Sequence, residues 1–237
     1  MKTIIHTANS RGIAQHGWLY SRHTFSFADY YNPERMHFGA LRVLNDDTVA
    51  PGMGFSAHPH RNMEIISIPL SGDLHHKDNT GRDAIIKEDD VQIMSAGSGI
   101  VHSETNANHN RQVKFLQIWV LPKELNITPR YQQMTLNSDS LKNQLVTVVA
   151  PDNDKALWIN QDAWFSLGKF DATTNINYQL HQPGNGVYVF VIEGSATINN
   201  TTLNNRDAMG ITEASEIPIH IEAGSHILLM EVPMITE

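Results

Sequence analysis

The 237-residue chain contains no cysteine. Disulfides, zinc–thiolate sites and thiol nucleophiles are therefore excluded, and any metal must be bound by imidazole and carboxylate groups. Basic residues are in the minority, because 17 Lys and Arg stand against 25 Asp and Glu, for a net charge of −8. This balance disfavours general binding to nucleic acid or to anionic membranes. The 13 histidines make an imidazole-based metal site feasible.

Long apolar segments are also missing. No run approaches the roughly 20 apolar residues that a membrane-spanning helix needs. The first residues, MKTIIHTANSRGIAQHGWLYSRH, lack the charged-then-apolar pattern of a signal peptide. We therefore expect a soluble, cytoplasmic protein that binds neither membranes nor nucleic acid directly. The sequence offers no basic patch and no long helix that would indicate a protein partner.

Helical periodicity is scarce, and most of the chain consists of short strand-like segments separated by turn residues. Glycine-containing segments such as SGD (71–73) and NTG (79–81) are typical of hairpin turns. The pattern predicts an all-β fold of sandwich or barrel type with few short helices. The strands predicted in the first half are 37–45, 63–70, 73–79, 82–88, 90–96 and 113–121.

The two halves of the chain show a faint internal repeat. EIISIPLSGDL resembles VYVFVIEGSAT, and EDDVQIMSAGSGIVHSE has a counterpart in NNRDAMGITEASEIPIHIE. The segment after Pro122 is polar and rich in turn residues, which places a domain junction near 125–140. We therefore expect a duplicated small β-barrel, with domains at 1–130 and 131–237.

Two histidine-containing pairs carry the most specific chemical signal. His58 and His60 are two residues apart, and so are His102 and Glu104. Residues two apart on a strand face the same side, so each pair can present both groups to one point. An isolated H-x-H is usually a surface pattern. The second pair, and the turn signals around both, favour a site of three histidines and one carboxylate.

These segments resemble successive motifs of the pirin family, which are two-domain members (bicupins) of the cupin superfamily. The resemblance rests on HPHRNMEI, SGDLHHKDNTG, MSAGSGIVHSE and LQIWVLP, with RHTFSFADYYNPERMHFGALRVLNDD upstream. It is close over about residues 20–122 and general beyond. It implies two cupin barrels, and a single metal, often iron, bound by His58, His60, His102 and Glu104.

A second glutamate competes for the carboxylate position. The general cupin pattern has a glutamate a few residues after H-x-H, and Glu64 stands there, with the same facing as His60 if one strand continues through both. The pirin resemblance favours Glu104 as the ligand and leaves Glu64 in a supporting role. Imidazole and carboxylate ligands suit Fe(II), our first choice, but also Zn, Ni, Cu, Mn and Co. Four protein ligands leave coordination positions open, which argues for catalysis.

Other residues are weaker candidates. Phe25 and Phe27 would share one face of a strand and cover the core, although the resemblance allows part of this arm to border the pocket mouth. Gln117 and Trp119 alternate on a strand that packs in the barrel, and they could line a pocket over the metal. The adjacent His75 and His76 point to opposite faces, so we expect structural or supporting roles for them.

The second half has no equivalent ligand set. Aligning the two repeats puts Leu180 and Gln182 at the H-x-H positions, and Ile219 and Ile221 at the H-x-E positions. His181, His220 and Glu222 lie one residue off, which on a strand means the opposite face. We expect a second barrel that lacks metal ligands and supports the first.

Three functions are compatible with these features. By resemblance to bacterial pirin-like proteins, the first is a quercetin 2,3-dioxygenase that cleaves a flavonol-like aromatic substrate with dioxygen. Glu104 would then be catalytic, accepting the proton of the flavonol 3-hydroxyl. The second is a metal-dependent, redox-sensing regulatory module with incidental flavonol turnover. A small-molecule isomerase or storage cupin is the third. The sequence leaves the native metal, the physiological substrate and the oligomeric state open.

Overall fold

Strands make up nearly all the regular structure of residues 1–234, the part of the chain that this computed structural model describes. The helical elements in this range are two short 3-10 helices, η1 (Ala8–Ser10) and η2 (Ser138–Leu141). The predicted all-β class with few short helices is therefore confirmed. None of the described helices has the length and hydropathy needed to cross a membrane.

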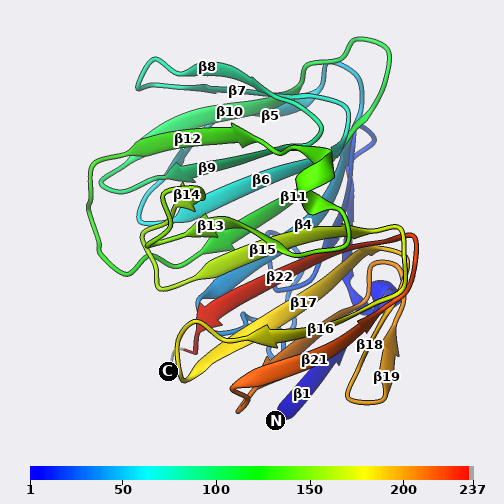
Figure 1. Cartoon of the computed structure of the whole chain (residues 1–237). Helices are drawn as coiled ribbons and strands as arrows, with labels where there is room; N and C mark the ends of the chain where they lie inside the picture. Colours follow the sequence, from blue (N-terminus) through cyan, green and yellow to red (C-terminus); the bar gives the residue numbers. More distant parts are fainter. Residues whose placement is uncertain (235–237) are drawn as a thin grey trace.

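The first barrel, in the upper half of Figure 1, is formed by two sheets. The larger sheet has the order β12-β9-β6-β11-β4-β3-β2 and the smaller has the order β5-β10-β7-β8. The bounds of the larger sheet are β2 (Gly12–Gln15), β3 (Leu19–His23), β4 (Leu41–Val49), β6 (Glu64–Ser71), β9 (Asp90–Ser95), β11 (Val113–Val120) and β12 (Arg130–Thr135). Those of the smaller sheet are β5 (Gly54–His60), β7 (Leu74–Asp78), β8 (Asp83–Ile86) and β10 (Ile100–Asn106).

The second barrel repeats this strand order, which shows the duplication that the sequence suggests. Its sheets have the orders β1-β20-β17-β22-β15-β13-β14 and β16-β21-β18-β19. The larger contains β1 (Lys2–His6), β13 (Val146–Ala150), β14 (Leu157–Trp158), β15 (Trp164–Phe170), β17 (Asn185–Glu193), β20 (Ala208–Thr212) and β22 (Ser225–Pro233). The smaller contains β16 (Thr174–Gln179), β18 (Ala196–Ile198), β19 (Thr201–Leu203) and β21 (Glu216–Ile221).

The first strand of the chain belongs to the sheet of the second barrel. β1 pairs antiparallel with β20, and Figure 1 shows it beside the second barrel. β12, which begins at the predicted boundary between 130 and 131, pairs with β9 of the first barrel. Both pairings bind the two halves together, and the boundary itself stays a proposal.

The two large sheets pack face to face and form the main hydrophobic core between the barrels. Buried side chains from β4, β6 and β11 meet those from β15, β17 and β22 in one cluster. Burial of this area from water is the main stabilising contribution to the arrangement. Representative members are Leu44, Ile66 and Ile118 of the first barrel, and Phe165, Tyr188 and Leu228 of the second.

Candidate metal centre

The interior of the first barrel is polar at positions where that of the second is mostly apolar. Gln117 on β11 lies in register with Asn45 on β4 and with Ser67 on β6, and Ser67 pairs with Gln92 on β9. All four are buried. A row of buried polar groups contributes little to stability and is typical of a functional interior. The corresponding row in the second barrel is Ser166, Leu229, Val189 and Met209, of which all but Ser166 belong to its hydrophobic core.

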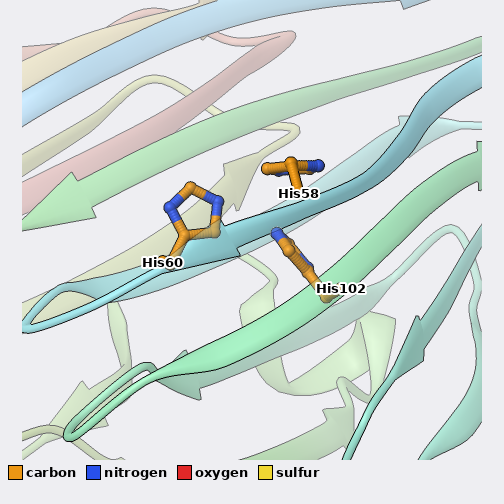
Figure 2. Close-up of side chains that lie close together, drawn as sticks. All are labelled: His58, His60 and His102. Carbon is orange, nitrogen blue, oxygen red and sulfur yellow. The ribbon is translucent and has the colours of Figure 1, made fainter.

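Three histidine rings converge in front of this row. His58 and His60 lie on β5, and His102 lies on β10, directly opposite His58 in the antiparallel pair. Figure 2 shows the rings of His58 and His60, from β5, close to the ring of His102 from the neighbouring β10. The ring centroids are 4.5 to 4.9 Å apart, and one ligand nitrogen of each ring lies within 4.8 Å of the others. The predicted imidazole cluster is thus present in the structure.

The tautomers of two of these rings suit a cation. His58 Nδ1 lies 2.7 Å from the carbonyl oxygen of Ser56, which can only accept, so Nδ1 carries the proton and Nε2 carries a lone pair. His102 Nε2 is buried and has no hydrogen-bond partner. A buried nitrogen of this kind is costly unless a ligand satisfies it. The residues present therefore fit a metal ion.

Burial keeps the rings of His60 and His102 neutral, and a neutral ring is what metal binding requires. Burial, aided by the neighbouring His58, lowers the pKa of His60 to about 4. The pKa of His102 falls to about 2, mainly through burial and then through the surrounding histidines. Neither ring is therefore protonated on both nitrogens near neutral pH, so each keeps one nitrogen lone pair for a cation.

Glu104 lies beside this cluster but belongs to a second group of ligand atoms, formed with His76 and His102. A register shift between His102 and Glu104 on β10 marks a bulge, which changes the aim of the side chains around it. The carboxylate of Glu104 is buried and accepts hydrogen bonds from Ser67 Oγ and Gln117 Nε2. Burial raises its pKa to about 7, against the opposing effect of these two donors.

His75 and His76 lie on opposite faces of β7, as their adjacency predicts. His75 is partly exposed and pairs with Asp83 at 2.6 Å. His76 is fully buried, and its Nδ1 lies 3.4 Å from Nδ1 of His102. His76 therefore contacts His102, one of the candidate metal ligands, directly.

Glu64 does not face the cluster, so the facing expected from its spacing to His60 is wrong. β5 ends at His60, and Asn62 in the following turn has φ of 50°, so Glu64 begins β6 in the other sheet. Its Oε2 accepts from Ser95 Oγ at 2.8 Å and from the backbone N–H of Asn160 at 3.2 Å. Glu64 thus links the two barrels.

The four predicted pocket residues separate into different environments. The prediction that Phe25 borders the pocket is wrong, because Phe25 is buried in the core between the barrels, where it packs against Tyr188. β3 ends at His23, so Phe25 and Phe27 do not share a strand face. Phe27 packs edge-on against Trp119, and Trp119 packs against His60. Gln117 contacts Glu104.

A hollow of about 390 Å³ lies beside His60, between the ends of β5 and β10. Its walls do not include the four predicted pocket residues. They consist of Pro59, His60, Arg61, Asn79, Gly99, Ile100 and Val101.

The second barrel has hydrophobic residues where the first has histidines. Ile219 and Ile221 are buried in its core, as the repeat alignment suggests. Strand pairing places Ile176 opposite Ile219, just as His58 lies opposite His102. Ile176, and not Leu180, is therefore the counterpart of His58, because Leu180 lies beyond the end of β16.

Several residues of the site were not singled out from the sequence. Ser67 and Gln92 interrupt the apolar strands EIISIPLS and DVQIMS at inward positions. A polar residue at an inward position of a buried strand is the signal that could have found them. Asp78, which contacts His76, carries no such signal, because it ends a strand beside a turn.

Two equivalent β-barrels, one of which gathers imidazoles and a carboxylate in a polar interior, define a bicupin with a candidate metal site. Residues 6–120 match the family model described as Pirin, and residues 147–232 match the quercetinase C-terminal cupin domain. The chain belongs to the pirin family.

Relatives cover nearly the whole chain. The quercetin 2,3-dioxygenase of Escherichia coli (strain K12) is 39% identical over 231 residues, spanning 95% of this chain and 96% of that protein. The crystal structure of the bacterial pirin YhhW from Escherichia coli, in complex with nickel(II), has a TM-score of 0.93 at 37% identity. It covers 99% of this chain and all of that one. A second crystal structure of YhhW has a TM-score of 0.94 and covers both chains fully, again at 37% identity.

Proposed function

We propose that this chain is a metal-dependent dioxygenase that cleaves flavonols such as quercetin with dioxygen. The observation that carries the proposal is the convergence of three imidazoles, one with an unpartnered buried Nε2, beside the buried carboxylate of Glu104. The activity in the name of the Escherichia coli relative supports the substrate class.

His58, His60 and His102 would hold the ion, with Glu104 as the proposed fourth ligand or close neighbour. A bound divalent ion would supply Lewis acidity and, if it is iron(II), the chemistry needed to use dioxygen. Iron(II) is our proposal, and zinc, nickel, copper, manganese and cobalt also suit these ligands. The related structure that contains nickel(II) supports binding of a divalent ion.

Glu104 is the proposed proton acceptor for the flavonol 3-hydroxyl. Burial raises the pKa of Glu104 to about 7 in the absence of an ion, which makes its carboxylate a stronger proton acceptor than that of an exposed glutamate. Ser67 and Gln117 donate to its two oxygens and hold it in place. Trp119 and Phe27 extend from His60 as an aromatic wall against which a planar substrate could pack.

The test is aerobic incubation of the purified, iron-loaded protein with quercetin, following loss of flavonol absorbance and release of carbon monoxide. We expect turnover by the wild type and none by His58→Ala. Glu104→Gln should lower kcat by about 10²- to 10⁴-fold, the usual contribution of a general base. Glu64→Gln changes the other buried glutamate of this barrel and serves as the matched control with normal turnover. Absence of turnover with iron and with every other divalent metal would refute the proposal.

A further inference from the structure

A chain of three buried side chains leads from the candidate metal centre to the wall of the first barrel. In the pairing of β10 with β7, His102 lies opposite Asp78, and Glu104 lies opposite His76. His76 Nε2 is 2.8 Å from Asp78 Oδ2, and His76 Nδ1 is 3.4 Å from His102 Nδ1. Asp78, His76 and His102 are all buried. The proposed function gives no role to Asp78 or His76.

The carboxylate of Asp78 is held in one orientation. Its Oδ1 accepts from the backbone N–H of Thr80 at 2.9 Å, from Thr80 Oγ1 at 2.6 Å and from the backbone N–H of Arg82 at 3.3 Å. These three donors occupy one oxygen and leave the other, Oδ2, to His76. The turn after β7 thus aims a fixed acceptor at the histidine.

The direction of each hydrogen bond follows from this acceptor. A carboxylate oxygen only accepts, so His76 Nε2 carries the proton, and its Nδ1 carries a lone pair because a neutral imidazole has one N–H. The hydrogen bond between the two rings then requires His102 Nδ1 to donate. The remaining nitrogen, His102 Nε2, keeps its lone pair, and it is this atom that is buried without a partner.

We propose that Asp78 and His76 are positioning residues that set the tautomer and the orientation of His102, so that its Nε2 lone pair is presented to a divalent cation. The proposal rests on the metal site of the proposed function. Hydrogen bonds that fix a ligating imidazole in this way commonly change metal affinity by about 10- to 100-fold.

The substitution Asp78→Asn tests the direction of the hydrogen bonds that link Asp78, His76 and His102, with little change in side-chain shape. The amide oxygen can keep the three donors from Thr80 and Arg82, which places the amide NH₂ against His76 Nε2. His76 must then carry its proton on Nδ1, and His102 must accept at Nδ1 and hold its proton on Nε2. We expect the affinity for Ni²⁺, measured by titration calorimetry, to fall about 10- to 100-fold.

The matched control is Asp83→Asn, which alters the exposed His75–Asp83 pair on the same hairpin. It should bind Ni²⁺ as the wild type does. A second comparison uses His76→Gln, which can donate to Asp78 and accept from His102, and His76→Leu, which can do neither. We expect Gln to retain most of the affinity and Leu to lose it, and this pair decides the question if Asp78→Asn does not fold.

Nitrogen-15 NMR of the metal-free protein reads the tautomer directly. We expect the proton of His102 on Nδ1 in the wild type and on Nε2 in Asp78→Asn. The proposal would be overturned if Asp78→Asn kept wild-type Ni²⁺ affinity and an unchanged His102 tautomer. Equal losses of Ni²⁺ affinity in His76→Gln and His76→Leu would also overturn it. Failure of the wild type to bind any ion would instead count against the proposed function, since the NMR measurement needs no metal.

Discussion

The ring of Trp119 meets the ring of His60 edge-on, with centroids 4.9 Å apart and an interplanar angle of 83°. Phe27 meets Trp119 in a similar geometry, at 5.2 Å and 87°. The rings of His58 and His102 each have a hydrogen-bond partner in the protein, whereas the ring of His60 is supported by its aromatic contact with Trp119.

Replacing Trp119 with leucine should therefore weaken metal binding. Loss of an edge-to-face contact costs about 0.5–1.5 kcal/mol, which corresponds to a decrease in Ni²⁺ affinity of up to about tenfold. Trp18→Leu is the control, because Trp18 makes a comparable contact with Phe55 elsewhere in the same barrel. Calorimetric titration of both variants checks the prediction, which is wrong if the two lose equal affinity.

Replacing Glu64 with glutamine should leave metal content unchanged and alter the pH dependence of stability. Burial raises the pKa of Glu64 in the folded protein. The folded state therefore holds this proton more tightly than the unfolded state, so wild-type stability falls as pH rises through the folded pKa. Glu64→Gln should lack this part of the decline. Urea unfolding between pH 5 and 8, with elemental analysis, measures both quantities, and loss of metal would return Glu64 to the ligand set.

His6 should make the attachment of β1 sensitive to acid. Its Nδ1 lies 2.7 Å from the hydroxyl of Tyr188, and burial, with a smaller effect of Arg35, lowers its pKa to about 4. The unfolded state then takes up a proton near pH 6.5 and the folded state only near pH 4. Stability is full above pH 6.5 and falls by about 3 kcal/mol towards pH 4.

The variant His6→Gln keeps a hydrogen-bonding partner for Tyr188 but cannot titrate. Its free energy of unfolding, followed with urea from pH 7 to pH 4, should decline less steeply than that of the wild type. Parallel curves for the two proteins would rule out His6 as a source of acid sensitivity.

Ile219 should matter for stability and not for metal binding. It is buried in the core of the second barrel at the position that His102 holds in the first. Ile219→Ala should lower the free energy of unfolding by about 2–5 kcal/mol, as is usual for a cavity in a packed core. Metal content per folded chain should stay at the wild-type value, and a lower value would show that the second barrel takes part in the site.

The histidine cluster could be predicted because a spacing of two on a strand fixes the facing of both side chains. This rule served for His58, His60 and His102, whose strands pair with each other. It failed wherever the strand ended early, as it does after His23, which sends Phe25 into the core between the barrels. It failed again at Glu64, where Asn62 turns the chain into the other sheet.

Contacts between distant segments had no sequence signal of their own. The approach of His76 to His102 depends on the pairing of β7 with β10, and the partner of Ile219 depends on where β16 ends. The exchange of β1 into the sheet of the second barrel is a further example, because residue 6 contacts residue 188. Such relationships follow from topology, which local periodicity does not specify.

Elemental analysis of the purified protein after iron loading and desalting tests most directly whether the three imidazoles bind a metal ion. We predict about one divalent ion per chain in the wild type and a large loss in each of His58→Ala, His60→Ala and His102→Ala, with folding confirmed by circular dichroism. A wild-type protein without bound metal, or three folded variants that retain it, would contradict the metal site.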